Sequence, residues 1–166
     1  LHNYIAGLQK YLPAVMPMLA PNVNSYRRLM RDSDAPINTH WAYDNRSAGL
    51  RVPHSEAADR RIENRIAGAD ANPYLVLAAV LAGMHHGMAA KIDPGPESKG
   101  NAYAAPAARM PTNWLDAIEL WQRSATMRDY FHEELVDTFA IVKEAEADRF
   151  NAEPSPLDFE YYLRTI

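Results

Sequence analysis

The sequence predicts an α+β fold that is mostly helical and includes a few short strands. Apolar residues recur at helical spacing near both ends of the chain, whereas residues 47–52 and 61–66 have the pattern of strands. Of the 166 residues, 48% are hydrophobic and 23% are charged, so the chain can bury a sizeable core. We therefore expect one folded domain.

The first half of the chain is expected to contain a helix, a turn and two strands. Residues 1–12 predict an amphipathic helix that Pro13 and Pro17 interrupt, because proline removes a helical hydrogen bond. Residues 21–25 are rich in turn-forming types. The two strands, 47–52 and 61–66, are bounded by turn-forming residues, which are Asp44-Asn45, Pro53 and Gly68.

The second half is expected to be helical around one long loop. Asn72 and Pro73 begin a nearly all-apolar run to Met84, which predicts a capped and buried helix. Prolines and glycines predict a loop over 92–112. Three helices should follow, over 113–126, 129–150 and 156–164, the second with an apolar stripe formed by Phe131, Leu135 and Phe139.

Composition argues against several classes of protein. A net charge of −4 does not suit general nucleic-acid binding, which needs a basic surface. The longest apolar stretch, 73–84, is too short to cross a bilayer. The chain contains no cysteine, so disulfides and thiolate metal sites cannot form, and we expect a cytoplasmic protein. Because Leu1 lies inside a predicted helix, we interpret the chain as part of a longer protein.

Arginine is concentrated in one segment of the chain. Eight of the 13 arginines lie within residues 27–65, a window that contains no lysine. Guanidinium groups bind carboxylates and phosphates bidentately, so this concentration favours oriented binding of anions. Six acidic residues share the window, and the alternative is a surface of ion pairs.

Spacing strengthens the case for anion binding. In a strand, Arg61, Glu63 and Arg65 would project from one face while Ile62 and Ile66 pack behind them. Such a face can hold a divalent cation beside a phosphate or carboxylate, as phosphoryl transfer requires. The alternative is a cross-strand ladder of salt bridges facing solvent.

Four segments resemble, in order and spacing, motifs from the C-terminal part of the glutamine synthetase catalytic domain. They are residues 24–29 (NSYRRL), 45–53 (NRSAGLRVP), 60–65 (RRIENR) and 72–75 (NPYL). The resemblance implies that residues 1–166 belong to that domain, with a few antiparallel strands packed with several helices. It also implies that an N-terminal β-grasp domain and the first half of the catalytic domain lie outside the chain.

The resemblance further implies an ATP-dependent ligase that uses Mg²⁺ or Mn²⁺. Glutamate's γ-carboxylate would attack ATP to give an acyl phosphate, and ammonia or an amine would then displace phosphate. Position by position, Arg28 and Arg65 match residues that bind glutamate, and Glu63 matches a metal ligand. The residues matching those that hold ATP are Arg46, Arg51 and Arg61, of which Arg46 also lies near the transferred group.

Asp34 matches a second catalytic position. Better-known bacterial relatives have a glutamate there, in a mobile flap ahead of Ala-Pro, whose carboxylate helps to accept the ammonium proton. Aspartate is one methylene shorter, and its alternative role is that of a turn residue. Tyr103 lies near the position at which some relatives have a tyrosine that is modified. The residues that follow Tyr103 differ from those in the relatives, so we expect an ordinary loop tyrosine. We interpret His85 and His86 as helix-end or interface residues rather than metal ligands, because adjacent helical residues point in different directions.

Residues 61–70, 100–103 and 158–162 are similar to γ-glutamylpolyamine synthetases more than to the ammonia-using enzyme. This favours an amine such as putrescine over ammonia. The competing hypothesis is a non-catalytic homologue that binds glutamate or a nucleotide, or an assembly module. The resemblance implies a homo-oligomer of stacked rings, with no nucleic acid or membrane among its partners. Because Glu63 is the one family metal ligand within the chain, we expect these 166 residues alone to be inactive.

Overall fold

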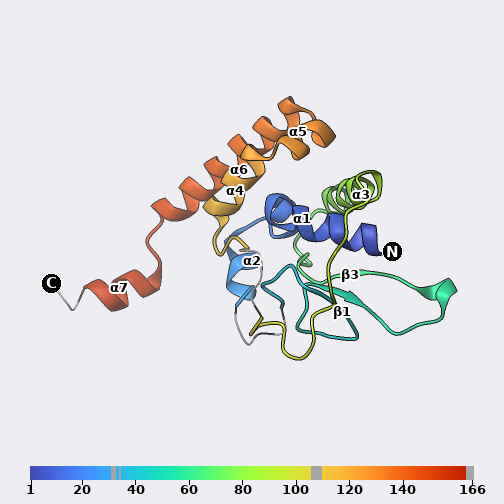
Figure 1. Cartoon of the computed structure of the whole chain (residues 1–166). Coiled ribbons are helices and arrows are strands. Elements are labelled where there is room, and N and C mark those ends of the chain that lie inside the picture. Colours follow the sequence, from blue (N-terminus) through green and yellow to red (C-terminus); the bar gives the residue numbers. More distant parts are fainter. Residues whose placement is uncertain (31–32, 34, 106–109, 164–166) are drawn as a thin grey trace.

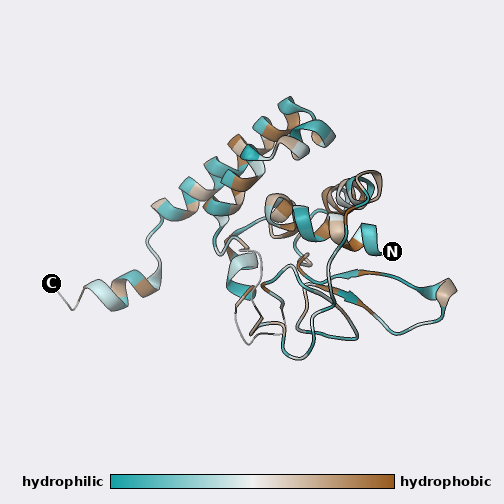
Figure 2. Ribbon diagram, viewed as in Figure 1, coloured by the Kyte–Doolittle hydropathy of each residue, from teal (hydrophilic) through white to brown (hydrophobic). Residues whose placement is uncertain are grey.

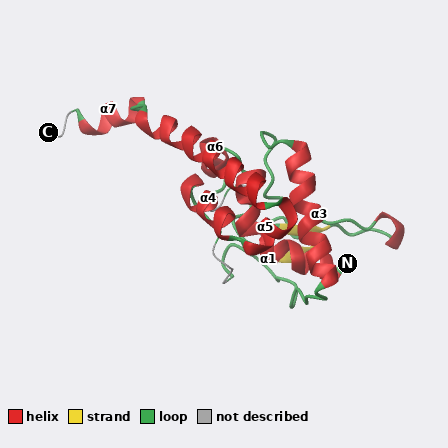
Figure 3. Cartoon of the chain, turned by 90° about the horizontal axis from the view of Figure 1, so that it is seen from above, coloured by secondary structure: helices red, strands yellow, loops and turns green. Residues whose placement is uncertain are grey.

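Seven α-helices, one 3-10 helix and three short strands make up the part of the chain that the structure describes (Figure 1; Figure 3). The structure is a computed structural model that describes residues 1–163 apart from 31, 32, 34 and 106–109. The elements are α1 (His2–Leu19), α2 (Val23–Arg28), β1 (Trp41–Tyr43), β2 (Leu50–Val52), η1 (Ala57–Asp59), β3 (Glu63–Asn64), α3 (Pro73–Ala89), α4 (Trp114–Arg123), α5 (Ala125–Phe131), α6 (Glu133–Ala152) and α7 (Pro156–Tyr162). The α+β, mostly helical prediction is confirmed.

The three strands form a mixed sheet in the order β1-β2-β3. The two predicted strands, β2 and β3, pair antiparallel as expected, whereas β1 pairs parallel with β2. β1 was not predicted, and the other two strands are shorter than expected. Strands of two or three residues are too short to show a clear alternation in the sequence. Between β2 and β3 the chain extends outward, with η1 at the tip of the excursion (Figure 1).

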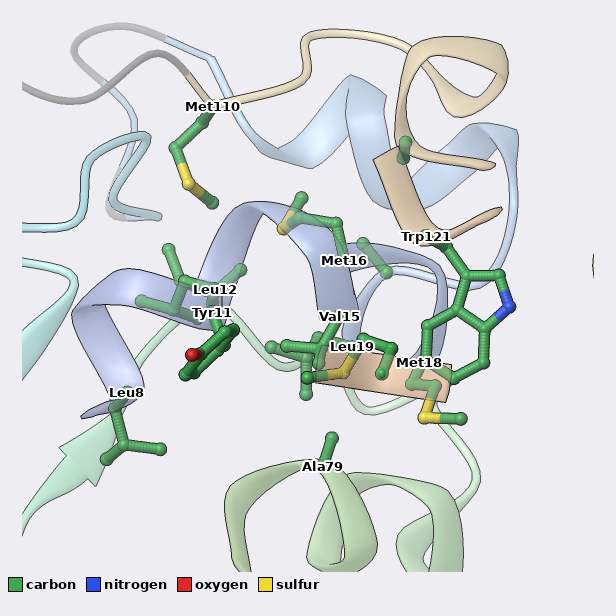
Figure 4. Close-up of a cluster of buried hydrophobic side chains, with 14 of the residues drawn as sticks. Leu8, Tyr11, Leu12, Val15, Met16, Met18, Leu19, Ala79, Met110 and Trp121 are labelled. Atoms are coloured by element: carbon green, nitrogen blue, oxygen red, sulfur yellow. The ribbon is translucent and has the colours of Figure 1, made fainter. Parts of the chain in front are cut away.

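Helix α1 is continuous through Pro13 and Pro17, which corrects the prediction that they interrupt it. An interior proline costs about 3 kcal/mol, because it removes a hydrogen bond and crowds the preceding turn. Leu12, Met16 and Leu19 are almost completely buried, and burying each such side chain contributes roughly 1.5–3 kcal/mol. Figure 4 shows these side chains with Ala79 of α3, Trp121 of α4 and Met110 around them. Core burial therefore outweighs the cost of the prolines.

Helices α1 and α3 cross in direct backbone contact at glycines. A Cβ atom placed on Gly7 would lie 2.0 Å from the carbonyl oxygen of Gly83, and one placed on Gly87 would lie 2.0 Å from that of Asn3. α3 begins at its Asn72 cap with Pro73 in the first turn, as predicted. The prediction that α3 is buried is wrong for one face, where Tyr74, Leu77 and Leu81 are exposed. The crossing buries the opposite face.

The C-terminal helices differ from the predicted boundaries. Ser124 ends α4 and caps α5, and His132, with φ of 64°, separates α5 from α6. The indole Nε1 of Trp121 donates to the carbonyl of Val136 over 2.9 Å, which joins α4 to α6. The expected apolar stripe is wrong at Leu135, which is exposed. The buried residues of α6 are Val136, Ala140 and Ala147.

Helix α7 lies apart from the rest of the chain in both views (Figure 1; Figure 3). Ser155 and Asp158 form its capping box, as their positions predicted. Hydrophobic and hydrophilic residues alternate along α6 and α7 (Figure 2), and Leu157 and Phe159 of α7 are more than half exposed. A search of the described residues for a helix with the length and apolarity of a membrane span found none.

We expect Gly7→Ala to lower the free energy of unfolding by about 1–3 kcal/mol, because the added methyl group forces the two helices apart. Gly83→Ala is the matched control, since the nearest atom to its Cβ would be the flexible tip of Leu8 at 3.3 Å, and the nearest backbone atoms would lie at an ordinary 3.6 Å. Urea unfolding of both variants measures the difference. Equal losses of stability would contradict the role of the backbone contact.

Candidate functional site

Arg51 lies at the centre of the charged residues on the sheet. It is the cross-strand partner of Glu63, and its Nη1 lies 2.9 Å from Glu63 Oε2. Its Nη2 lies 3.0 Å from Asp44 Oδ1, and Arg61 Nη2 approaches Glu63 Oε1 at 3.6 Å. The hydrogen bond that Arg51 donates to Glu63 raises the pKa of Arg51 above its usual range. The predicted proximity of Arg61 and Glu63 is confirmed, and Arg51 joins them from the neighbouring strand.

Asp44 belongs to this group, although the sequence indicated it only as a strand boundary. It follows β1 in the left-handed region, with φ of 45°. Its Oδ1 accepts a hydrogen bond from the backbone N–H of His54 over 3.0 Å. That bond and the Arg51 guanidinium hold the pKa of Asp44 below its ordinary value. Asp44 therefore remains an anion that orients Arg51.

Arg46 occupies the turn between β1 and β2, and its two neighbours hold that turn in place. Asn45 Oδ1 accepts from the backbone N–H and the hydroxyl of Ser47. The side chain of Arg46 is exposed, and within the described part of the chain it makes no hydrogen bond or ion pair. The motif thus fixes the backbone and leaves the guanidinium open to a ligand.

The 95–103 segment of the predicted loop is bonded to the residues around β1. Trp41 Nε1 donates to Gly95 O, and the backbone N–H of Ser98 donates to Trp41 O. Asn45 Nδ2 donates to Gly100 O over 2.7 Å, and the backbone N–H of Ala102 donates to the hydroxyl of Ser47. This segment supports the turn that carries Arg46.

Asp34 lies outside the described residues, so its catalytic role stays a prediction. Its neighbours Ser33 and Ala35 both accept from the hydroxyl of Tyr103, over 2.6 and 3.1 Å. Tyr103 therefore has a structural contact in the loop, which sequence reasoning missed because its partners are about 70 residues away.

Arg28 lies on α2, where a turn had been predicted; that prediction is wrong for residues 23–25. Asn22 caps this helix by accepting from the backbone N–H groups of Asn24 and Ser25. Arg28 Nη2 donates to the carbonyl of Ile66, which directly follows Arg65. The backbone N–H of Arg65 donates to Gly49 O, so Arg65 extends the β2-β3 pairing. The two arginines predicted to bind glutamate therefore belong to segments that meet at the end of β3.

The described residues do not make up a complete metal site. They include no group of three or more histidine, aspartate or glutamate side chains that could hold an ion. Glu63 is the one predicted metal ligand, and both of its oxygens face guanidinium groups. Three cavities of about 350, 340 and 310 Å³ are lined by residues other than Arg46, Arg51, Arg61, Glu63 and Arg65. A shared pocket for ATP and glutamate therefore stays a prediction for the longer protein.

The two adjacent histidines contact different aromatic rings near the end of α3. His85 Nδ1 lies 2.6 Å from the hydroxyl of Tyr130, and the ring of His86 packs edge-on against Tyr11 at 4.8 Å. Their expected position near the helix end is confirmed.

Comparison with known proteins identifies the family. A model of the glutamine synthetase catalytic domain matches residues 1–162. The chain belongs to the glutamine synthetase family.

Curated relatives include synthetases that are named for different products. The chain is 34% identical to gamma-glutamylputrescine synthetase of Escherichia coli, over 99% of the chain and 35% of the relative. It is 35% identical to gamma-glutamylethanolamide synthetase of Streptomyces coelicolor, over 92% of the chain and 33% of the relative. It is 32% identical to a glutamine synthetase of Pasteurella multocida, over 96% of the chain and 36% of the relative. The chain spans about a third of the length of these relatives.

We expect Asp44→Asn to lower the melting temperature at pH 7. Below about pH 4, the difference in melting temperature from the wild type should become progressively smaller. The pKa of Asp44 is lowered in the folded state, so its contribution is complete above the unfolded value of about 3.9 and is lost as the pH falls through the lower folded value. Thermal unfolding between pH 7 and 3 measures the effect. Asp148→Asn, at an exposed position on α6, is the control. A difference from the wild type that stays constant down to pH 3 would contradict the assignment.

Proposed function

We propose that the full-length protein is an ATP-dependent ligase that forms a γ-glutamyl amide from glutamate and an amine or ammonia. The observation that carries the proposal is the match to the glutamine synthetase catalytic domain over residues 1–162. The arginines of the matching motifs keep a chemically suitable arrangement, with Arg51 and Arg61 both forming ion pairs with Glu63.

In this proposal, fixed guanidinium groups stabilise the charge that develops on ATP's terminal phosphate. Arg51 is already oriented by Asp44 and Glu63, so little reorganisation is needed when negative charge appears. Arg61 and the exposed Arg46 would contact the same phosphates. Arg28 and Arg65 would hold the carboxylates of glutamate, because a planar guanidinium orients a carboxylate better than an ammonium does.

Two further parts of the proposal need residues outside the described set. Glu63 would be one ligand of Mg²⁺ or Mn²⁺, with the remaining ligands supplied by the longer protein. Asp34 would accept the proton released when the amine attacks the acyl group. We propose a homo-oligomer, because apolar side chains on α3 and α7 are exposed here and would be covered by other subunits or by the rest of the protein.

We propose that the acceptor is an amine rather than ammonia. Two of the three relatives described above are named for amines, putrescine and ethanolamine, and their identity to this chain is slightly higher than that of the glutamine synthetase. The chemical distinction is whether the site accommodates a carbon chain on the attacking nitrogen.

An amine panel on the full-length protein tests the proposed activity. We expect phosphate release that requires both glutamate and an acceptor, with putrescine or ethanolamine more effective than ammonia, and mass spectrometry should detect the γ-glutamyl amide. Preference for ammonia would overturn the amine assignment. Binding of ATP and glutamate without turnover would favour the non-catalytic homologue instead.

Arg51→Lys should lower kcat/KM for ATP by about tenfold or more, because one ammonium cannot replace two oriented guanidinium contacts. The KM for glutamate should change much less. Arg123→Lys on α4 is the matched control, since its side chain is exposed and pairs only with Glu119. Steady-state kinetics with each substrate varied in turn measures both effects, and an equal loss in the control would count against the assignment.

A further inference from the structure

Asp70 links the helix that carries Arg28 to the segment that follows β3. Its Oδ2 accepts a hydrogen bond from the hydroxyl of Ser25 and another from Asn22 Nδ2, each over 2.8 Å. Asn22 is the cap of α2 and Ser25 is the third residue of the helix, and together they form its capping box. One carboxylate oxygen therefore holds both members of the cap, across more than 40 residues of sequence.

Helix α2 needs such a contact, because its six residues are too few for a helix to be stable alone. Arg28 lies in its last turn and donates to the carbonyl of Ile66, four residues before Asp70. The segment from Ile66 to Asp70 thus contacts α2 at both ends. Asp70 fixes the first turn, and Ile66 receives the guanidinium from the last.

The bend that presents Asp70 is itself held against the core. The backbone N–H of Gly68 donates to Leu19 O at the end of α1 over 2.9 Å. A Cβ atom on Gly68 would lie 2.2 Å from Asp70 Oδ1, so a larger residue there would displace the Asp70 carboxylate. Ser25 is 2% exposed, so its hydroxyl is buried. Loss of the Asp70 acceptor would leave this buried hydroxyl without that hydrogen bond and would destabilise the folded state.

Electrostatics agrees with this geometry. Partial burial pushes the pKa of Asp70 upward, but the hydrogen bonds from Ser25 and Asn22, together with the charge of Arg28, hold it below its ordinary value. Asp70 is therefore an anion at neutral pH, and its two hydrogen bonds are charge-assisted.

We propose that Asp70 is the positioning residue that sets the place of Arg28 for glutamate. The identity of the ligand, glutamate, rests on the proposed function. The hydrogen bonds between Asp70 and α2 are independent of that function. Asp70 acts through the cap of α2 rather than by touching the substrate. Its removal should therefore weaken glutamate binding more than ATP binding or the chemical step.

In the full-length protein, we expect Asp70→Ala to raise the KM for glutamate on the order of tenfold, because a small displacement of a positioning group is costly. The KM for ATP and kcat should stay within about twofold of the wild type. Asp70→Asn should restore most of the loss, since its amide oxygen can still accept from Ser25 and Asn22. Asp129→Ala, an exposed aspartate on α5, is the matched control.

Two additional measurements keep this proposal separate from the proposed function. Amide hydrogen exchange should accelerate over residues 23–28 in Asp70→Ala and stay unchanged over α3, whether or not the wild type has ligase activity. The effects of Ser25→Ala and Asp70→Ala on that exchange should be non-additive, because the two side chains share one hydrogen bond. Unchanged exchange in α2, or equal rises in the KM for ATP and glutamate, would overturn the positioning role. An inactive wild type would overturn the proposed function alone.

Discussion

The contact between α1 and α3 joins the parts of the chain that lead to Arg28 and from Arg65. α1 leads through a three-residue connection into α2, which carries Arg28, while the segment that contains Arg65 leads into α3. The two helices cross with backbone against backbone at Gly7, Gly83 and Gly87. Both parts of the candidate glutamate site are therefore attached to one helix pair, and the hydrogen bond from the Gly68 N–H to Leu19 O joins the two segments directly. Close-packed interiors transmit small displacements, so substitutions at the crossing should be felt at Arg28.

The carboxylates of the site have a structural role besides any role toward ligands. Asp44 and Glu63 hold Arg51 between them, and Asp70 holds the helix of Arg28. A guanidinium bonded in this way is oriented before a substrate arrives, but it is also partly neutralised. In the proposed function, an entering phosphate would compete with Glu63 for Arg51, and this competition would favour a highly charged anion over a weakly charged one.

Local signals in the sequence predicted the parts of the fold that depend on neighbouring residues. The Asn72-Pro73 start of α3 and the Ser155 cap of α7 need only a few adjacent positions, and both were predicted. The continuity of α1 through Pro13 and Pro17 was not predicted, because it depends on burial against other helices. The parallel pairing of β1 and the exposed face of α3 also depend on distant segments. For the site, motifs identified the arginines and Glu63, but Asp44 and Asp70 act on partners that no local pattern connects to them.

The hydrogen bonds of segment 95–103 make it behave as part of the region around β1, about fifty residues earlier. Through Gly100, Ala102 and Tyr103 it braces both the backbone beside Arg46 and the carbonyls of Ser33 and Ala35. A deletion or insertion in this segment would therefore alter the arginine turn before it altered the helices next to it in sequence. Variation in the length of this brace would therefore move the turn that carries Arg46 without replacing any residue of the matching motifs.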